Sequence, residues 1–135
     1  MYLEYIALMI IHWVADFVIQ TRQEAKNKST SNKYLLLHTV KYSLLYISFF
    51  PLIGRAVFLF IGITFITHTI IDYFTSRVSK NLWTKREMLK VIDKDLSSRW
   101  EHLFWCTIGF DQCLHIIQLI ITYTMIENGY FNRFF

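Results

Sequence analysis

Three histidine–aspartate pairs recur inside apolar stretches of this chain, with the two partners four positions apart. The pairs are His12–Asp16, His68–Asp72 and, in reverse order, Asp111–His115. Residues four apart lie on one face of a helix, so each pair can direct an imidazole and a carboxylate at a common point. A further apolar stretch supplies one more imidazole, His38. Neutral imidazole and ionised carboxylate are ligands of zinc, manganese and iron, so the pattern indicates a metal site.

These groups give seven candidate metal ligands: His12, Asp16, His38, His68, Asp72, Asp111 and His115. Seven exceed the needs of one tetrahedral ion, so two ions, or one ion with aspartates outside its coordination sphere, both fit. The three aspartates are also the candidate catalytic groups, as a base or as orienting groups. Two other interpretations stay open at this point: a polar cluster that conducts protons or ions, and purely structural hydrogen bonding between helices.

The elements that must position these groups are four apolar segments, at about 1–20, 34–50, 52–74 and 103–126. Each has about the 17–25 residues that a membrane-spanning helix needs. The chain is 54% hydrophobic, above the ~45–50% of soluble domains, and its mean hydropathy is +0.33. We therefore predict an all-α fold, a four-helix transmembrane bundle that forms one integral membrane domain over residues 1–135. Ionisable groups in hydrocarbon are costly, so they should face the interior of the bundle.

The basic residues are concentrated in two of the connections. Eleven of the fourteen Lys and Arg fall within 21–33 and 75–102. The positive-inside rule makes both connections cytoplasmic loops and places both termini outside the cytoplasm. This topology accounts for the net charge of +4 without a nucleic-acid partner, and none is expected. It also places all seven candidate ligands in the cytoplasmic half of the bundle, where they can meet.

The second basic loop contains a helical pattern of its own. Within residues 86–103, apolar side chains recur at spacings of three or four: Leu89, Ile92, Leu96, Trp100 and Leu103. This spacing predicts an amphipathic helix that lies at the membrane interface between the third and fourth spans.

Three further residues are candidate substrate contacts. Gln20 extends the face of His12 and Asp16 by one more turn, and Gln112 neighbours Asp111 but points roughly 100° around the helix. Lys28 lies in the first basic loop, near the cytoplasmic mouth of the bundle, where lysines attract anionic headgroups.

With these motifs in place, the chain resembles a family of small, uncharacterised multi-pass membrane proteins of bacteria and their phages, a domain of unknown function. The resemblance is carried by HxxxDFxxQ at 12–20, His38, HxxxD at 68–72 and DQxxH at 111–115, and it covers nearly the whole chain. Lys28 looks like a recurrent lysine of that family. The chain is also distantly similar to membrane-bound metal-dependent hydrolases. These resemblances imply a bacterial inner membrane, or a host membrane if the chain is phage-encoded.

The function expected from these observations is that of a multi-pass membrane metalloprotein. It would bind one or two divalent ions (Zn, Mn or Fe) and hydrolyse a phosphate-containing or lipid-linked substrate, with a metal-activated water as nucleophile. Its partners would be the bilayer and that substrate. The alternatives are a non-enzymatic membrane protein, either an ion or proton conductor or a small phage effector of the host membrane, and a soluble all-helical di-metal protein.

Overall fold

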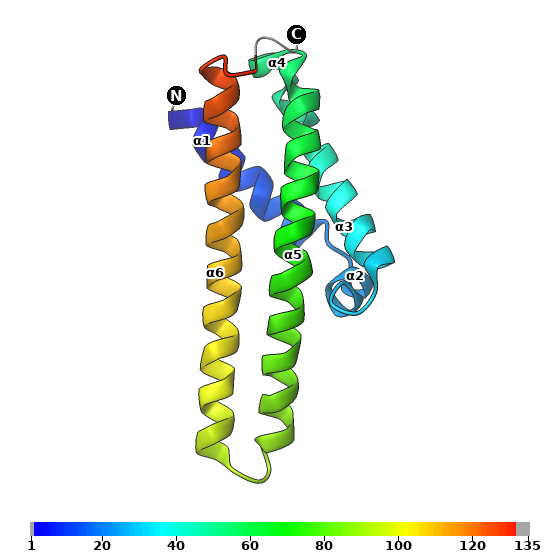
Figure 1. Cartoon of the computed structure of the whole chain (residues 1–135), viewed down its shortest axis with the longest axis vertical. Coiled ribbons are helices and arrows are strands. Elements are labelled where there is room, and N and C mark those ends of the chain that lie inside the picture. The colour runs from blue at the N-terminus through cyan, green and yellow to red at the C-terminus, as the bar shows by residue number, and fades with distance from the viewer. Residues whose placement is uncertain (1, 132–135) are drawn as a thin grey trace.

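The computed structural model describes residues 2–131 of the 135-residue chain, and these residues are almost wholly helical (Figure 1). The elements in chain order are α1 (Tyr2–Trp13), the π-helix η1 (Val14–Val18), α2 (Arg22–Asn27), α3 (Asn32–Leu44), the 3₁₀ helix η2 (Leu45–Phe49), α4 (Phe50–Ile53), α5 (Ala56–Leu89) and α6 (Lys94–Glu127). No strand occurs among the described residues, so the prediction of an all-α fold is confirmed.

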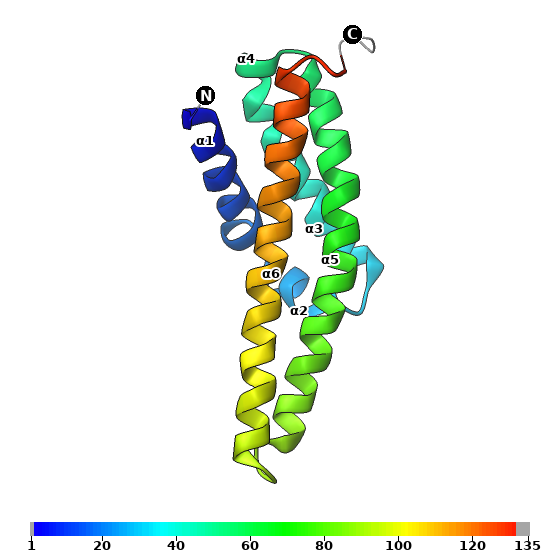
Figure 2. The ribbon, with the colours of Figure 1, turned by 60° about the vertical axis from the view of Figure 1, so that its left-hand side comes forward.

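In the part of the chain that the structure describes, three helical segments, not four, are long and apolar enough to cross a membrane. They are the run from α3 to α4 (Asn32–Ile53), α5 and α6. The prediction of a spanning helix at 1–20 is wrong, because the helical run formed by α1 and η1 covers only residues 2–18. At about 1.5 Å per residue it falls short of the ~30 Å hydrocarbon core. A π-helix and a turn then carry the chain away, and α1 leans obliquely against α6 (Figure 2).

The two longest helices, α5 and α6, form an antiparallel hairpin that runs the full length of the molecule (Figures 1 and 2). The prediction of a loop at 75–102 with its own interfacial helix at 86–103 is therefore wrong. The helix α5 continues to Leu89, and α6 begins at Lys94. The apolar spacing in 86–103 belongs to two helices that face each other, and it happens to continue across the short turn between them.

Local chemistry explains where this hairpin turns. The side chain of Asp93 accepts a hydrogen bond from the backbone N–H of Leu96 at 2.9 Å, an N-cap that starts α6. On the facing surfaces, Arg86 lies 3.0 Å from Glu101, and the Ser97 hydroxyl donates to the carbonyl of Arg86 at 3.1 Å. These contacts hold the two helices together next to the turn.

The other sharp reversal joins α4 to α5 at Gly54. Its φ of +53° lies in the left-handed region that side chains disfavour, so glycine suits this position. The reversal makes the run from α3 to α4 antiparallel to α5, and it brings the first turns of α3 beside the middle of α5.

One buried stripe on α5 shows how the interior changes along the bundle. Its members, at spacings that keep one helix face, are Val57, Phe60, Thr64, His68, Asp72 and Ser79. The stripe is apolar where it meets the aromatic core of α3 and η2, and it is ionisable in the middle of the helix. Toward the turn between α5 and α6 it ends in the hydroxyl of Ser79. The candidate site thus lies at the boundary between the apolar core and the basic end of the molecule.

The first basic loop, 21–33, contains the short helix α2, which a capping box begins. Thr21 accepts a hydrogen bond from the N–H of Glu24, and the Glu24 carboxylate accepts one from the N–H of Thr21 at 2.8 Å. Glu24 is only 1% exposed. Lys41 of α3 donates to it at 2.7 Å. This ion pair fixes α2 against the side of α3 and explains why an apolar segment carries a lysine.

We predict that Lys41→Met destabilises the protein by about 2 kcal/mol at neutral pH, because it leaves a buried charge without its partner. Burial raises the pKa of Glu24, but Lys41 and Thr21 outweigh burial and hold it below its ordinary value of 4.5. The contribution of the pair is therefore complete above that value and is lost as the pH falls below it. Thermal unfolding in detergent should show a large difference from wild type at neutral pH and a smaller one well below pH 4.5. An equal difference at both pH values would contradict this assignment.

Candidate functional site

Four segments that are distant in sequence meet in the middle of the bundle, and each contributes ionisable groups. Asp16 comes from η1, His38 from α3, His68 and Asp72 from α5, and Asp111 and His115 from α6. None of these six side chains is more than 8% exposed. The structure therefore brings together six of the seven residues that the sequence offered as metal ligands.

Within this cluster, two sets of three residues can hold a metal ion. The first set is Asp16, His38 and His68, and the second is His68, Asp72 and His115. In each set, one donor atom per residue lies within 4.8 Å of the others. His68 belongs to both sets. Its Nε2 lies 3.3 Å from Nε2 of His38, and both imidazoles therefore face the same point.

The carboxylate of Asp72 lies at the centre of the cluster. Its Oδ2 is 3.4 Å from Nε2 of His38 and 3.5 Å from Nε2 of His68, and its Oδ1 is 3.4 Å from Nε2 of His115. From the pocket side, Lys28 donates to Oδ2 at 2.9 Å. Burial works against the charge of Lys28, but Asp72 and Asp16 outweigh it and raise the pKa of Lys28 above its ordinary value.

The π-helix η1 determines the position of Asp16. A π-helix has about one more residue per turn than an α-helix and often occurs at functional sites. Here it follows directly after α1 and buries both Ala15 and Asp16. One oxygen of Asp16 lies 3.1 Å from Nε2 of His38. The i,i+4 spacing predicted a shared face for His12 and Asp16, but it could not predict this local widening of the helix.

His12, the seventh candidate ligand, lies at the edge of the cluster. Its Nδ1 is 2.7 Å from the hydroxyl of Tyr42, and its Nε2 is 2.9 Å from the amide oxygen of Gln112. Both ring nitrogens therefore have protein partners. The amide nitrogen of Gln112 in turn donates to Asp16 and to Asp111, each at 3.0 Å. Gln112, predicted as a packing or substrate residue, links His12 to two carboxylates and orients them.

The remaining glutamine supports His38. The amide nitrogen of Gln20 lies 3.2 Å from Nδ1 and 3.4 Å from Nε2 of His38. Such partners hold the ring orientation of metal-binding histidines and select their tautomer.

The sequence analysis missed two residues of the site. The ring of Tyr42 stacks on His68 with centroids 3.7 Å apart, and Thr75 donates to the carboxylate of Asp111 at 2.5 Å. Both had a detectable signal. Tyr42 follows His38 by four residues and Thr75 follows Asp72 by three, so each shares the helix face of a candidate ligand.

Several buried polar atoms of the cluster have no hydrogen-bond partner within the described part of the chain. They are Nδ1 of His68, both ring nitrogens of His115 and Oδ1 of Asp16. Two of these atoms face the cluster at short range without forming a hydrogen bond: Oδ1 of Asp16 lies 3.1 Å from Nε2 of His38, and Nε2 of His115 lies 3.4 Å from Oδ1 of Asp72. Buried polar atoms are nearly always satisfied, so these two atoms fit an additional bound group.

The charge of the cluster also favours a bound cation. With neutral imidazoles, the three carboxylates carry three negative charges and Lys28 carries one positive charge, which leaves a net charge of about −2 in a buried volume. One divalent cation would neutralise it. The donor set contains only nitrogen and oxygen, which suits zinc, manganese or iron.

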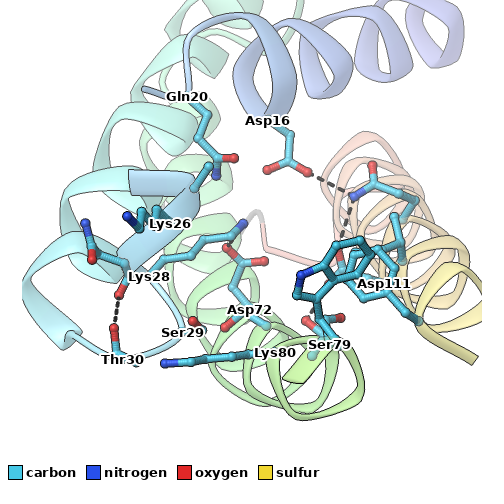
Figure 3. Close-up of a pocket in the computed structure, with 18 of the residues that line it drawn as sticks. Asp16, Gln20, Lys26, Lys28, Ser29, Thr30, Asp72, Ser79, Lys80 and Asp111 are labelled. Atoms are coloured by element: carbon cyan, nitrogen blue, oxygen red, sulfur yellow. Dashed lines mark hydrogen bonds and ion pairs between the residues drawn. The ribbon is translucent and has the colours of Figure 1, made fainter. Parts of the chain in front are cut away.

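A pocket of about 530 Å³ opens beside the cluster (Figure 3). Asp16 and Asp72 face its interior, and the side chain of Lys28 reaches across it to Asp72. From there the pocket extends along α5 and α6 toward the turn that joins them, past Ser79 and Lys80. The three predicted substrate contacts, Gln20, Lys28 and Gln112, all line it. A small molecule can therefore approach the carboxylates directly.

Comparison with known proteins gives a family for the chain but no activity. No curated protein and no solved structure matches it. One family model, described as protein of unknown function (DUF3307), matches residues 5–133 and so includes every residue of the cluster. The chain therefore belongs to the DUF3307 family.

Proposed function

We propose that this protein is a membrane metalloenzyme that hydrolyses a phosphate-containing or lipid-linked substrate. The observation that carries the proposal is the buried cluster itself. Ligand atoms from four segments converge on one volume, several have no hydrogen-bond partner, and the volume holds a net negative charge. The pocket beside the cluster adds a route for substrate.

The two sets of ligands define the candidate ion positions. His38, His68 and Asp16 would hold one ion, and His115, His68 and Asp72 would hold an ion at the alternative or second position. Because both sets use His68 and one imidazole nitrogen binds only one ion, they describe two alternative positions for one ion, or two ions of which only one has His68 as a ligand. His12 would not bind the ion directly, because Tyr42 and Gln112 lie within hydrogen-bond distance of both of its ring nitrogens.

A divalent ion in this site would lower the pKa of a coordinated water to about 7 and withdraw charge from a phosphoryl oxygen. In the hydrolysis, the water oxygen bonds to phosphorus, the phosphorus–oxygen ester bond breaks, and the proton passes to the leaving alcohol. Asp16 is buried and lines the pocket, so its carboxylate would accept the proton from water when the ion occupies the position of His68, Asp72 and His115. Gln112 holds Oδ2 of this carboxylate.

The proposed orientation in the membrane follows from charge. Residues 21–33 and 75–102, around α2 and the turn between α5 and α6, carry eleven of the fourteen Lys and Arg, so they would face the cytoplasm. The beginning of α1 and the end of α6 lie together at the opposite end of the molecule (Figure 1). The pocket would then open on the cytoplasmic side.

Packing argues against the alternative of an ion or proton conductor. A layer of fully buried side chains covers the cluster on the side opposite the turn between α5 and α6: Tyr46, Phe49, Val57, Phe60 and Leu119. A hydrogen-bonded chain runs from His12 through Tyr42 to Tyr46 and meets this apolar layer. A conductor needs polar groups or water through the whole membrane, and a dense aromatic layer opposes that.

Elemental analysis tests the proposal at its first step. Protein purified in detergent without chelators is expected to contain one or two zinc, manganese or iron ions per chain. Less than about 0.1 ion per folded chain would overturn the metal assignment. Circular dichroism on the same sample establishes that the protein is folded. Release of phosphate from lipid and soluble phosphoesters, measured before and after chelation, then tests the hydrolase.

A further inference from the structure

Two serine hydroxyls on α5 line the pocket without a hydrogen-bond partner. The Oγ atoms of Ser76 and Ser79 are buried and unpaired within the described residues, and Ser79 is only 7% exposed. The neighbouring Thr75 differs, since it donates to Asp111. A buried hydroxyl without a partner costs about 1–3 kcal/mol. The two serines therefore fit a ligand that brings its own acceptor oxygens.

Two lysines at the same pocket have no ion-pair partner among the described residues. Lys26 comes from α2 and Lys80 from α5, so they approach the pocket from different elements (Figure 3). Lys28 differs because Asp72 already neutralises it. Ammonium groups and hydroxyls around one volume favour an anion with several oxygens, which is the chemistry of a phosphate group.

The rest of the lining is apolar. Phe17 of η1, Trp83 of α5, and Phe104 and Ile108 of α6 complete the pocket. Phe17 is 53% exposed, so this wall continues onto the outer surface of the helices. A soluble phosphate would gain nothing from these side chains, whereas a phosphate attached to a hydrocarbon chain would bury apolar surface against them.

We infer that the pocket binds a phosphate-bearing amphiphile, with its phosphate between Lys26, Lys80 and the two serines and its apolar chain against the apolar wall of the pocket. The volume of about 530 Å³ lies within the ~300–1,000 Å³ of ligand pockets. The inference rests on the proposed function, because it names the class of substrate that would be presented to Asp16 and the bound ion.

Native mass spectrometry of the protein as purified in detergent tests the ligand. The probes are phosphatidic acid, diacylglycerol with the same acyl chains, and inorganic phosphate. Phosphatidic acid should bind at least about tenfold more tightly than either of the others. Equal binding of diacylglycerol would overturn recognition of the phosphate. Equal binding of inorganic phosphate would overturn the role of the apolar wall.

Ser79→Ala separates a ligand contact from a structural one. The variant should bind phosphatidic acid about tenfold more weakly, while its unfolding temperature stays equal or rises, because an unsatisfied buried hydroxyl is removed. Ser98→Ala, an exposed serine on α6, is the matched control and should change neither quantity. Loss of stability with unchanged affinity would overturn the assignment.

A pair of lysine variants tests the charge in the same assay. Lys80→Gln should weaken the binding of phosphatidic acid and leave the binding of diacylglycerol unchanged. Lys90→Gln, at the turn between α5 and α6, is the control and should leave both affinities unchanged. The metal content of each sample separates the two proposals. A metal-free protein that still prefers phosphatidic acid overturns the proposed function alone, and a metal-loaded protein without that preference overturns this inference alone.

Discussion

Replacing His68 with alanine is expected to lower metal affinity by at least about 100-fold, more than any other single change in the cluster. His68 is the ligand common to both candidate ion positions, so its loss removes a donor from each. The same variant should lose any chelator-sensitive phosphoesterase activity. Elemental analysis after dialysis against a metal buffer measures the affinity.

The structural role of His68 must be separated from its role as a ligand. Its ring is fully buried and stacks between Tyr42, at 3.7 Å, and His115, at 4.0 Å, so alanine also leaves a cavity. That loss should cost about 2–4 kcal/mol. A purely structural histidine predicts this destabilisation alone. A metal ligand also predicts that chelators lower the unfolding temperature of wild type but not of the variant.

His102 provides the matched control, because it lies on α6 but is exposed and outside the cluster. His102→Ala should retain the metal content and the chelator response of wild type. If the His68 variant retained both as well, the site would not be a metal centre.

The second large effect is expected for Asp72→Asn, which should lower the free energy of unfolding by about 3–5 kcal/mol. The amide has nearly the same shape as the carboxylate but no charge. The ammonium of Lys28 would lose its 2.9 Å partner, and three imidazoles would lose the carboxylate that faces them. Thermal or denaturant unfolding in detergent measures the change.

A double variant shows how much of this effect belongs to the ion pair. Lys28→Met should lower the free energy of unfolding when it is introduced alone, and much less when it is added to Asp72→Asn. The coupling free energy between the two substitutions should be at least about 1 kcal/mol. Asp95→Asn, an exposed carboxylate in the first turn of α6, should shift stability by less than about 0.5 kcal/mol. Strictly additive effects of the two site variants would mean that Lys28 and Asp72 do not depend on each other.

The sequence predicted the helical class and the residues of the site more accurately than the number and bounds of the helices. The helical class was foreseen from composition, and the convergence of His38, His68, Asp72 and His115 was foreseen from their matched depth in the predicted spans. The number of spanning helices and the interfacial helix were not. Apolar length suggested a first span, but η1 ends that helix early, and a periodic pattern at 86–103 concealed the turn before Lys94.

Spacing along the chain determined which side chains share a helix face, because the geometry of an α-helix is local and does not depend on its neighbours. It therefore indicated the residue types of the site, three His–Asp pairs and one more histidine. Only the tertiary structure decided how these faces meet. The reversals at Gly54 and Asp93 align α3, α5 and α6, and the pair of Glu24 with Lys41 places α2 over the pocket. These contacts join residues far apart in sequence, so the spacing of His12 and Asp16 could not reveal that one supports the site while the other faces its centre.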